Sequence, residues 1–154
     1  MVESSETLEA FIKNNKIDAE IIRSKLDVSS SLSPELSAIV DPASIIKSIC
    51  LILDNKTAVV AILYLMDKID FEKIKTELNV KEVRLAHDNE IIQTTKYAKG
   101  GVPPIGYKLY FLLDSKVLEK DTVYGGGGDK NALIKIKVKD IISLDKPRIF
   151  NFTV

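Results

Sequence analysis

Two apolar runs separated by a short polar turn dominate the pattern of hydrophobic and polar positions along the chain. Residues 45–53 and 57–66 consist largely of aliphatic side chains, many of them β-branched, and the polar turn at 54–56 lies between them. A strand with one solvated face would alternate apolar and polar positions, whereas a strand that is buried on both faces is apolar throughout. The pattern therefore predicts a hairpin at the centre of a sheet.

Shorter segments with a helical or an extended pattern lie on both sides of this hairpin. Apolar positions at helical spacing predict helices at 5–14, 71–78 and 89–95, with Asp88 as the N-cap of the third, and a last helical turn at 140–144. Ser33 and Pro34 predict the start of a further helix that ends near 41–42, after a serine-rich loop at 28–32. Strands are predicted at 19–23, 83–86, 107–113, 122–124, 132–138 and 148–152. The strand at 132–138 alternates cleanly, which is typical of a sheet with one exposed face.

A loop between residues 99 and 106 holds three glycines and two prolines. Glycine admits positive φ and the close approach of a ligand, while proline fixes φ and removes an N–H, so the loop is expected to be rigid. Such a loop is either a tight crossover between strands, the commoner case when it is taken alone, or a cradle whose free amides bind a ligand. The four glycines at 125–128 match neither a P-loop nor a dinucleotide fingerprint, because no Gly-Lys-Ser/Thr ending is present and a strand follows.

The composition limits the chemistry that the chain can support. The length of 154 residues predicts one domain that spans 1–154. The single cysteine excludes an internal disulfide and a cysteine-based zinc cluster. One histidine leaves few options for transition metals. No window reaches the roughly 18 apolar residues of a membrane span, and residues 1–10 carry three glutamates in place of a signal peptide. We expect a cytoplasmic protein with no cofactor, no metal and no membrane partner.

Charge is balanced overall but unevenly distributed along the chain. There are 22 basic and 22 acidic side chains, which argues against a protein that holds DNA or another nucleic acid by bulk charge. Residues 1–95 contain 11 basic and 16 acidic side chains, whereas residues 96–154 contain 11 and 6. The second part could therefore face an anionic partner, although a solvated lysine face without a partner is the commoner cause of such a bias.

Three side chains invite a chemical interpretation. Lys47 places a charge at the entrance of the central strand, where it either extends to solvent from the strand end or binds an anion beside the sheet. Cys50 lies in the same run without a neighbour that would activate it, which favours a small core side chain over a nucleophile. His87 has no cysteine or carboxylate at a triad-like spacing, which favours a capping or core-edge role over catalysis.

The order and spacing of these motifs resemble the YbaK/ProX family, the free-standing relatives of the editing domain inserted in bacterial prolyl-tRNA synthetases. The resemblance covers nearly the whole chain and rests on Ile-Ile-Lys-Ser at 45–48, Val-Arg-Leu-Ala at 83–86, Gly-Gly-Val-x-Pro-x-Gly at 100–106, the Gly-Gly-Gly turn before the alternating strand, and Lys-Asp-Ile at 139–141. It implies an α+β fold in which a mixed, mostly antiparallel, barrel-like sheet is flanked by helices.

The resemblance also implies a function and the residues that carry it. The family hydrolyses the ester bond of wrongly charged aminoacyl-tRNA, here that of a small amino acid on a tRNA such as tRNA(Pro). The partners would be the acceptor end of the aminoacyl-tRNA and an aminoacyl-tRNA synthetase. Lys47 matches the lysine that meets the terminal adenosine, and the loop at 100–104 matches the one that holds the aminoacyl ester. The implied catalytic residues are Lys47, Gly100 and Gly101, and the implied substrate-binding residues are Ser48, Val102, Pro104, Gly106, Gly127 and Gly128.

The sequence departs from the family pattern at three positions. Pro103 stands where the loop usually has Ser or Thr, which removes a hydroxyl and an amide donor. Gly126 stands where the bacterial Cys-tRNA(Pro) deacylases have Ser, and Leu133 falls on their strand aspartate. These differences leave open which amino acid is removed. In particular, they leave open whether that amino acid is cysteine.

Ester hydrolysis requires an attacking water, stabilisation of the oxyanion and a proton acceptor. Gly100, Gly101 and Val102 keep N–H groups that can donate to the oxyanion, each typically worth about 3–4 kcal/mol. The motifs hold no convincing general base, which fits the family picture, in which the 2′-hydroxyl of the substrate's own adenosine or a substrate side chain assists. Two alternatives stay open: a non-catalytic module of the same fold that binds tRNA or a synthetase, and a domain that binds a small molecule.

Overall fold

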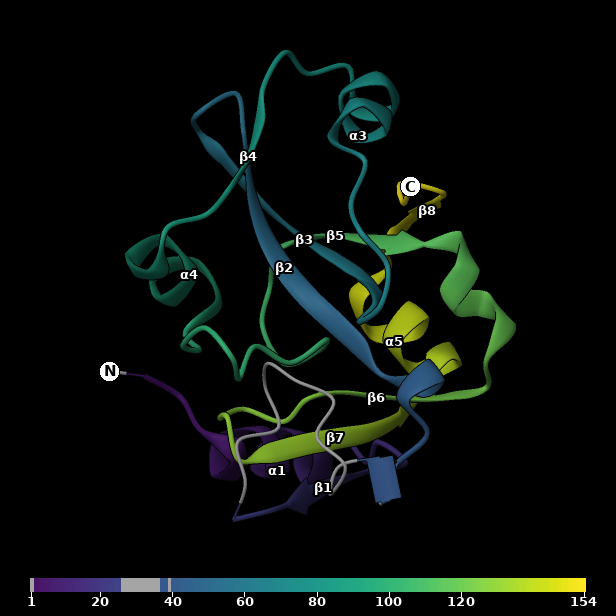
Figure 1. The fold of residues 1–154 in the computed structure, drawn as a ribbon. Helices are drawn as coiled ribbons and strands as arrows, with labels where there is room; N and C mark the ends of the chain where they lie inside the picture. The colour runs from purple at the N-terminus through teal and green to yellow at the C-terminus, as the bar shows by residue number, and fades with distance from the viewer. Residues whose placement is uncertain (1, 26–36, 39) are drawn as a thin grey trace.

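The hairpin of β2 (Ile46–Leu53) and β3 (Thr57–Tyr64) forms the centre of a five-stranded sheet in the computed structural model, which describes residues 2–25, 37–38 and 40–154 (Figure 1). The strand order is β4-β2-β3-β5-β8, with β4 (Val83–Leu85), β5 (Tyr110–Asp114) and β8 (Arg148–Phe150). β2 is antiparallel to β3 and β4, while β5 is parallel to β3 and β8. Residues 59–63 are buried throughout because apolar clusters cover both faces of the sheet, which confirms the prediction from the apolar run.

A second, three-stranded sheet shares a core with the first. Its order is β1-β7-β6, and β1 (Ala19–Arg23) and β6 (Thr122–Gly126) are both antiparallel to β7 (Ala132–Lys137). The two sheets contribute to this core Ile46, Val60, Ile62, Val123, Ile134 and Ile136. The predicted α+β class and the mostly antiparallel pairing are confirmed, but the strands form two sheets that are not closed into a barrel.

Helices pack against both sheets. The main core receives Leu8 and Ile12 from α1 (Ser5–Asn14) and Ile141 from α5 (Val138–Asp145). The other face of the five-stranded sheet is covered by α3 (Phe71–Leu78), whose Ile74 is fully buried there. The remaining elements are α4 (Asp88–Thr95) and the 3₁₀ helices η1 (Pro42–Ser44) and η2 (Ser115–Glu119). Within the part of the chain that the structure describes, no helix combines the length and apolarity needed to cross a membrane.

Several predicted strand boundaries are wrong by a few residues. The strand predicted from residue 107 begins at Tyr110, because Tyr107 belongs to the preceding loop, where its hydroxyl donates to the Pro103 carbonyl oxygen at 2.7 Å. The strand predicted at 122–124 continues through two glycines, since Gly125 and Gly126 pair with β7. The last strand ends at residue 150 instead of 152, because the chain after it turns toward a buried carboxylate.

Two helix ends also differ from the prediction. The N-cap of α4 is His87 instead of Asp88, and the His87 backbone N–H donates to the Glu90 carboxylate at 2.8 Å. The last helix spans residues 138–145, where only a turn at 140–144 was predicted. The loop predicted at 28–32 and the helix start predicted at Ser33 and Pro34 lie outside the described residues.

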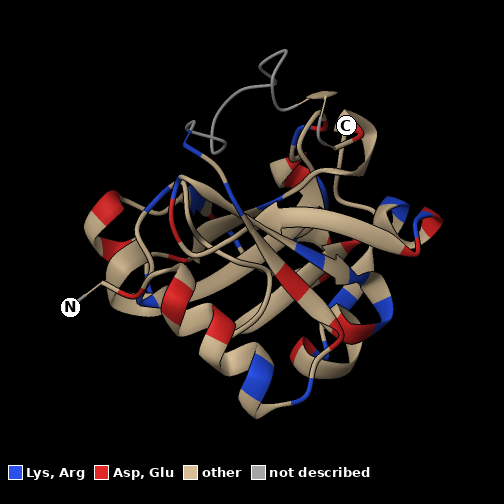
Figure 2. Ribbon diagram, turned by 90° about the horizontal axis from the view of Figure 1, so that it is seen from below, with Lys and Arg blue, Asp and Glu red and all other residues tan. Residues whose placement is uncertain are grey.

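Pairing of β1 with β7 brings acidic residues of the first part of the chain against basic residues of the second. The Lys137 ammonium lies 2.8 Å from the Asp18 carboxylate, and the Lys135 ammonium lies 3.8 Å from Glu20. Figure 2 shows basic and acidic residues interspersed over the elements. The positive excess of residues 96–154 is therefore partly neutralised by the fold.

A buried carboxylate anchors the last residues of the chain. Asp114, at the end of β5, is 0% exposed and accepts hydrogen bonds from the Phe152 N–H at 2.9 Å and from the Asn151 amide and Thr153 hydroxyl at 3.3 Å. We expect Asp114→Ala to lower the free energy of unfolding by about 2–4 kcal/mol, because it removes a charged acceptor and leaves buried donors unpaired. Urea unfolding at constant m-value measures the loss, with the exposed Asp121→Ala as control. Equal midpoints for the two variants would contradict this account.

A second buried carboxyl predicts how stability depends on pH. At the end of α5, the Asp145 Oδ2 atom is buried without a partner among the described residues, and burial raises the pKa of this carboxyl to about 8. The unfolded carboxyl ionises near about pH 4, so between pH 4 and 8 the folded state binds more protons and stability falls as pH rises. Asp145→Asn is therefore expected to raise the melting temperature at pH 8 and to have no effect near pH 4. Melting curves that stay parallel across this range would contradict the assignment.

Candidate functional site

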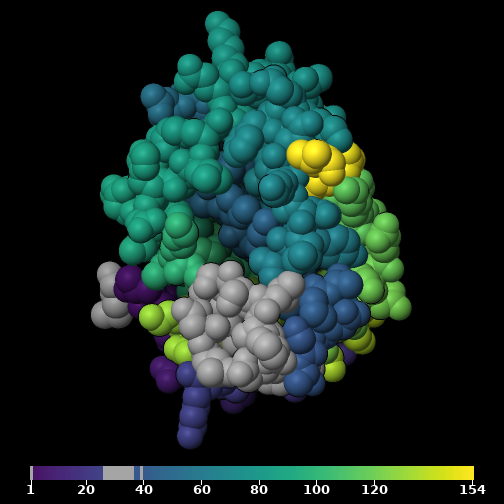
Figure 3. Space-filling view, in the orientation of Figure 1, coloured from purple at the N-terminus to yellow at the C-terminus, as the bar shows by residue number. Residues whose placement is uncertain are grey.

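On the side away from β3, a stretch of β2 has no strand partner among the described residues, between the bridge of Ile45 to Tyr124 of β6 and the pairing with β4. β4 pairs only with residues 51–53 of β2, and the N–H of Ala86, just after β4, donates to the Cys50 carbonyl oxygen at 3.0 Å. Residues 47–48 therefore have no strand neighbour on this edge. In the space-filling view of Figure 3, blue atoms of the β2–β3 region are visible in a recess between teal atoms on either side.

A cavity of about 120 Å³ lies at this free edge. Residues of both sheets and of the 99–106 loop line it: Ile45, Ile46, Lys47, Ser48, Leu65, Gly100, Val102, Gly125, Gly126, Ala132 and Leu133. Among these described lining residues, polar side chains come from Lys47 and Ser48, and none is Asp, Glu or His. The cavity is thus a small aliphatic pocket with one cation and one hydroxyl.

Two glycine-rich segments close one side of this cavity by direct backbone contact. The Gly128 N–H donates to the Gly101 carbonyl oxygen at 2.9 Å. A Cβ added at Gly126 would overlap the Val102 carbonyl group, and one added at Gly101 would lie 2.6 Å from the Asp129 Cα. Since real Cβ atoms essentially never approach so closely, glycine is required at both positions for the segments to meet.

The structure brings together four of the residues that the sequence analysis assigned to a site. Lys47 and Ser48 of β2 and Gly100 and Val102 of the loop all line the cavity. Gly101 lies between Gly100 and Val102, buried against the turn that follows β6.

The other predicted site residues lie beside the cavity and do not line it. Pro104 packs against Gly125, since a Cβ added at Gly125 would lie 3.3 Å from the Pro104 Cδ. Gly127 packs against the start of β7. Gly106 faces Leu8 and Phe11 of α1, and Gly128 packs against residues 4–5. Gly106 and Gly128 both have φ of +102°, so they shape the loops instead of contacting the pocket.

Sequence reasoning missed part of the lining. Ile45, Leu65 and Leu133 form an aliphatic wall, together with Val40. Gly125 and Gly126 were expected in a turn, whereas they belong to β6 and line the cavity. The run of four glycines was the available signal, but only strand pairing distinguishes the two that line the pocket from the two that do not.

The loop leaves two of its three predicted amide donors available. The Gly101 N–H donates to the Ala98 carbonyl oxygen at 3.0 Å, so it is engaged within the loop. The N–H groups of Gly100 and Val102 have no hydrogen-bond acceptor among the described residues, and both residues line the cavity. Among the three predicted donors, these two amides are therefore the candidates for a ligand in the cavity.

Burial and the neighbouring Asp67 carboxylate act in opposite directions on the pKa of Lys47. Burial lowers the pKa of its ammonium below the ordinary lysine value, the Asp67 carboxylate raises it, and the Lys68 ammonium lowers it further. Asp67 and Lys68 lie in the segment between β3 and α3. Lys47 is half-buried, so its charge is less screened than that of a surface lysine.

The sequence of the chain matches a known family. The model of the aminoacyl-tRNA editing domain family matches residues 27–144. The chain belongs to this family. The resemblance that the sequence motifs predicted is therefore confirmed, and an aminoacyl-tRNA editing role comes with it.

Solved structures share the fold of this aminoacyl-tRNA editing domain. A protein whose assigned role as a trans-editing enzyme for prolyl-tRNA synthetase is itself only proposed superposes with a TM-score of 0.86 at 18% identity, over 97% of this chain and 96% of that one. The hypothetical protein APE2540 superposes with a TM-score of 0.84 at 22% identity, over 96% of this chain and 99% of that one. A protein from Marinobacter aquaeolei VT8, tentatively assigned to signal transduction, matches over 97% of this chain but 30% of its own length, with a TM-score of 0.66 at 18% identity.

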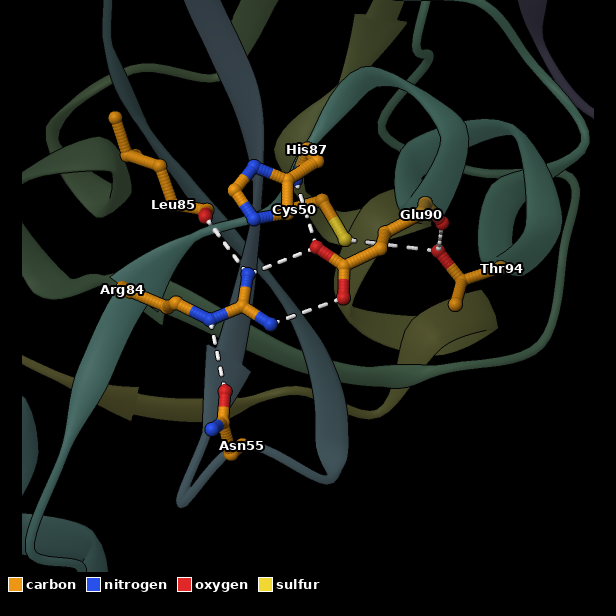
Figure 4. Close-up of polar contacts among 7 residues, drawn as sticks. All are labelled: Cys50, Asn55, Arg84, Leu85, His87, Glu90 and Thr94. Atoms are coloured by element: carbon orange, nitrogen blue, oxygen red, sulfur yellow. Dashed lines mark hydrogen bonds and ion pairs between the residues drawn. The ribbon is translucent and has the colours of Figure 1, made fainter.

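An ion pair outside the cavity of this editing domain fixes the helix that leads into the glycine-proline loop. The Arg84 guanidinium of β4 donates to both carboxylate oxygens of Glu90 in α4, at 2.8 and 3.0 Å, and also to the Asn55 side chain at 3.1 Å (Figure 4). Arg84 and the His87 N–H together lower the pKa of Glu90 to about 2. The contact joins α4 to the sheet edge just beyond the free part of β2.

Cys50 and His87 take the structural roles that their surroundings predicted. Cys50 is 4% exposed, lies 3.6 Å from the Thr94 hydroxyl, and its thiol pKa is raised by burial, which disfavours the thiolate (Figure 4). His87 caps α4 from an exposed position. Among the described residues, no group of three His, Cys, Asp or Glu side chains is arranged to hold a metal ion.

Proposed function

We propose that this editing domain hydrolyses the ester bond between a small amino acid and the 3′ end of a tRNA to which it was wrongly attached, tRNA(Pro) being the expected case. The observation that carries the proposal is the cavity itself. Its described lining combines a lysine, a serine hydroxyl and two loop amides without an acceptor among the described residues, around about 120 Å³ of space whose other described side chains are aliphatic. The aminoacylated end of a tRNA has an ester carbonyl oxygen that the amides can bind and a phosphate-linked adenosine that the cation can bind.

In the proposed reaction, the Gly100 and Val102 N–H groups donate to the ester carbonyl oxygen and bind it more tightly as it becomes an oxyanion. Lys47 contributes positive charge at the same cavity, next to the terminal adenosine. Because no Asp, Glu or His is among the described lining residues, the proton of the attacking water passes to a group of the substrate, such as the 2′-hydroxyl of its adenosine. As the bond breaks, that 2′-hydroxyl gives its own proton to the leaving 3′-oxygen, so one proton moves in all from the water to the leaving group.

The pocket walls support a small, apolar amino acid. Gly126 and Leu133 replace the serine and aspartate of the bacterial Cys-tRNA(Pro) deacylases, so two polar partners for a thiol are lost. A synthetase that activates proline cannot fully exclude smaller amino acids, since one methylene is worth only about 1–3 kcal/mol of discrimination. A separate small pocket can hydrolyse the esters of the smaller amino acids that such a synthetase attaches by mistake.

A panel of aminoacyl-tRNAs tests the proposal. Catalytic amounts of the protein are incubated with tRNA(Pro) charged with alanine, cysteine, serine or proline, and the remaining ester is followed over time against buffer. We expect the protein to shorten the lifetime of at least one small aminoacyl ester. Binding to tRNA without any change in ester lifetime would reject the deacylase and favour the accessory module.

Two exposed lysines on the loops beside the cavity are placed to contact the tRNA backbone. Lys99 precedes Gly100, and Lys130 follows Asp129, against which Gly101 packs. Neither forms an ion pair with a described residue. We expect the double change Lys99→Glu, Lys130→Glu to weaken tRNA binding and to make its dependence on salt shallower, because fewer counterions are released.

Filter binding at several salt concentrations measures this effect. The matched control is Lys56→Glu, an exposed lysine in the β2–β3 turn at the opposite end of β2. If the control weakens tRNA binding as much as the double variant, the loop lysines do not form the proposed contact.

A further inference from the structure

The backbone N–H and carbonyl oxygen of Ser48 lie at the edge of the cavity and have no hydrogen-bond partner among the described residues. The Ile45 carbonyl oxygen accepts the Leu65 N–H on the β3 side, at 2.8 Å, whereas the Cys50 carbonyl oxygen accepts the Ala86 N–H on the opposite side. Backbone groups of alternate residues point to opposite edges of a strand. The N–H and carbonyl oxygen of Ser48 therefore point to the same edge as those of Cys50, where β4 has already ended.

The side chain of Ser48 is unpartnered as well. Its hydroxyl oxygen is buried and has no hydrogen-bond partner among the described residues, although Ser48 lines the cavity. A buried hydroxyl without a partner is destabilising, typically by about 1–3 kcal/mol. Such a group is commonly explained by an absent ligand or water that completes its hydrogen bonds.

The chemistry of an aminoacyl ester indicates which group reaches Ser48. Only the α-carbon separates the amino nitrogen from the carbonyl carbon, so an ester held by the Gly100 and Val102 amides brings its amino group into the same cavity. An amine needs hydrogen-bond acceptors, and the Lys47 ammonium offers none. Among the described lining residues, Ser48 supplies the one side-chain acceptor and, beside it, a backbone carbonyl oxygen for which the described residues offer no donor.

We propose that Ser48 recognises the α-amino group of the substrate, through its hydroxyl and its backbone carbonyl at the free edge of β2. The inference rests on the proposed function and adds the group that orients the amino acid. With the amine held at β2 and the carbonyl oxygen held by the loop, the side chain of the amino acid points toward the aliphatic wall of Ile45, Leu65 and Leu133. An acyl group that lacks the amine loses one of these anchors.

Non-hydrolysable analogues test this without any need for catalysis. The two probes are 3′-alanylamino-3′-deoxyadenosine and its propionyl counterpart, which differ only by the amino group. Each is titrated by NMR into wild type, Ser48→Ala and Ser48→Thr. We expect wild type to bind the alanyl probe about tenfold more tightly than the propionyl probe, the effect of one or two hydrogen bonds. Ser48→Ala should reduce this ratio to about twofold, while Ser48→Thr keeps the hydroxyl and most of the preference.

Stability provides a readout that separates recognition from structure. Removing a buried hydroxyl without a partner should leave the melting temperature of Ser48→Ala unchanged or raise it, whereas a structural serine would lower it. The exposed Ser143→Ala serves as control and should change neither affinity nor stability. The proposal is overturned if wild type binds both probes equally or not at all, or if Ser48→Ala weakens both alike, which would place Ser48 against the adenosine. If no aminoacyl-tRNA of the panel is deacylated but the protein still prefers the alanyl probe, the proposed function is rejected and the role of Ser48 is not.

Discussion

Lys47→Ala is expected to lower the rate of aminoacyl-tRNA deacylation by about 100-fold or more, because it removes the only cation among the described residues that line the cavity. Lys47 is half-buried, so its charge acts on a bound ester through a medium that screens it less than water does. Burial already lowers the pKa of its ammonium, so loss of this side chain should not destabilise the fold. Single-turnover deacylation with the best substrate of the panel measures the effect.

The comparison for this variant is Lys56→Ala, which removes an exposed lysine from the other end of the same strand. Its deacylation rate and melting temperature should equal those of wild type. Near-wild-type activity in a well-folded Lys47→Ala protein would reject the catalytic assignment of Lys47, whatever the family membership of the chain.

Gly126→Ala is expected to reduce deacylation by a similar factor, although the added group is a single methyl. The new Cβ would overlap the Val102 carbonyl group, so the loop that carries the Gly100 and Val102 amides must move away from β6. A displacement of reacting groups by about 1 Å can cost about 100-fold in rate. Overpacking of this kind should also lower stability by about 1–3 kcal/mol.

Gly125→Ala provides the matched control, since Gly125 is the neighbouring residue of β6 and also lines the cavity. Its added Cβ would lie 3.2 Å from the Ile46 Cγ1 and 3.3 Å from the Pro104 Cδ, which are side-chain atoms that can shift by a few tenths of an ångström. Deacylation and urea unfolding should therefore rank wild type, Gly125→Ala and Gly126→Ala in that order. The reverse order would show that contact with the loop does not shape the pocket.

The same contact concerns the serine that, by the sequence resemblance, the bacterial Cys-tRNA(Pro) deacylases have at position 126. A serine there carries the same Cβ as alanine and would meet the same Val102 carbonyl. Glycine at position 126 is therefore required by the packing of this loop. This is one of the differences from the family pattern that left the amino acid of the substrate undetermined. Restoring the serine in this chain is expected to disrupt the pocket.

Much of the fold could be predicted from local pattern. The central hairpin, α1, β1 and α3 lie where the sequence placed them, because burial on both faces or on one helical stripe leaves a periodic signature. Some errors lie at the ends of β8, α4 and α5, and two lie at segments next to the pocket that contain tyrosine or glycine. Residues 107–109 alternate like a strand but serve the loop, and two of four glycines belong to β6.

The candidate site was predicted only in part. Lys47, Gly100 and Val102, which line the cavity, were singled out because a lysine in an apolar strand and a glycine-proline loop are visible in sequence, whereas Ser48 was assigned through the family resemblance. Gly101 was predicted as a donor, yet its N–H is engaged by Ala98, which depends on the turn that the loop adopts. The aliphatic wall went unnoticed because its residues look like ordinary core positions.

The sequence by itself determined the order of the elements, the buried hairpin and the chemical character of the loop, because these follow from the periodicity and conformational preferences of neighbouring residues. Only the tertiary structure decided which edge of β2 stays unpaired, which loop amides remain free and how closely the two glycine segments meet. Those features depend on where β4 stops beside β2 and on contacts between residues far apart in the chain, such as Val102 with Gly126.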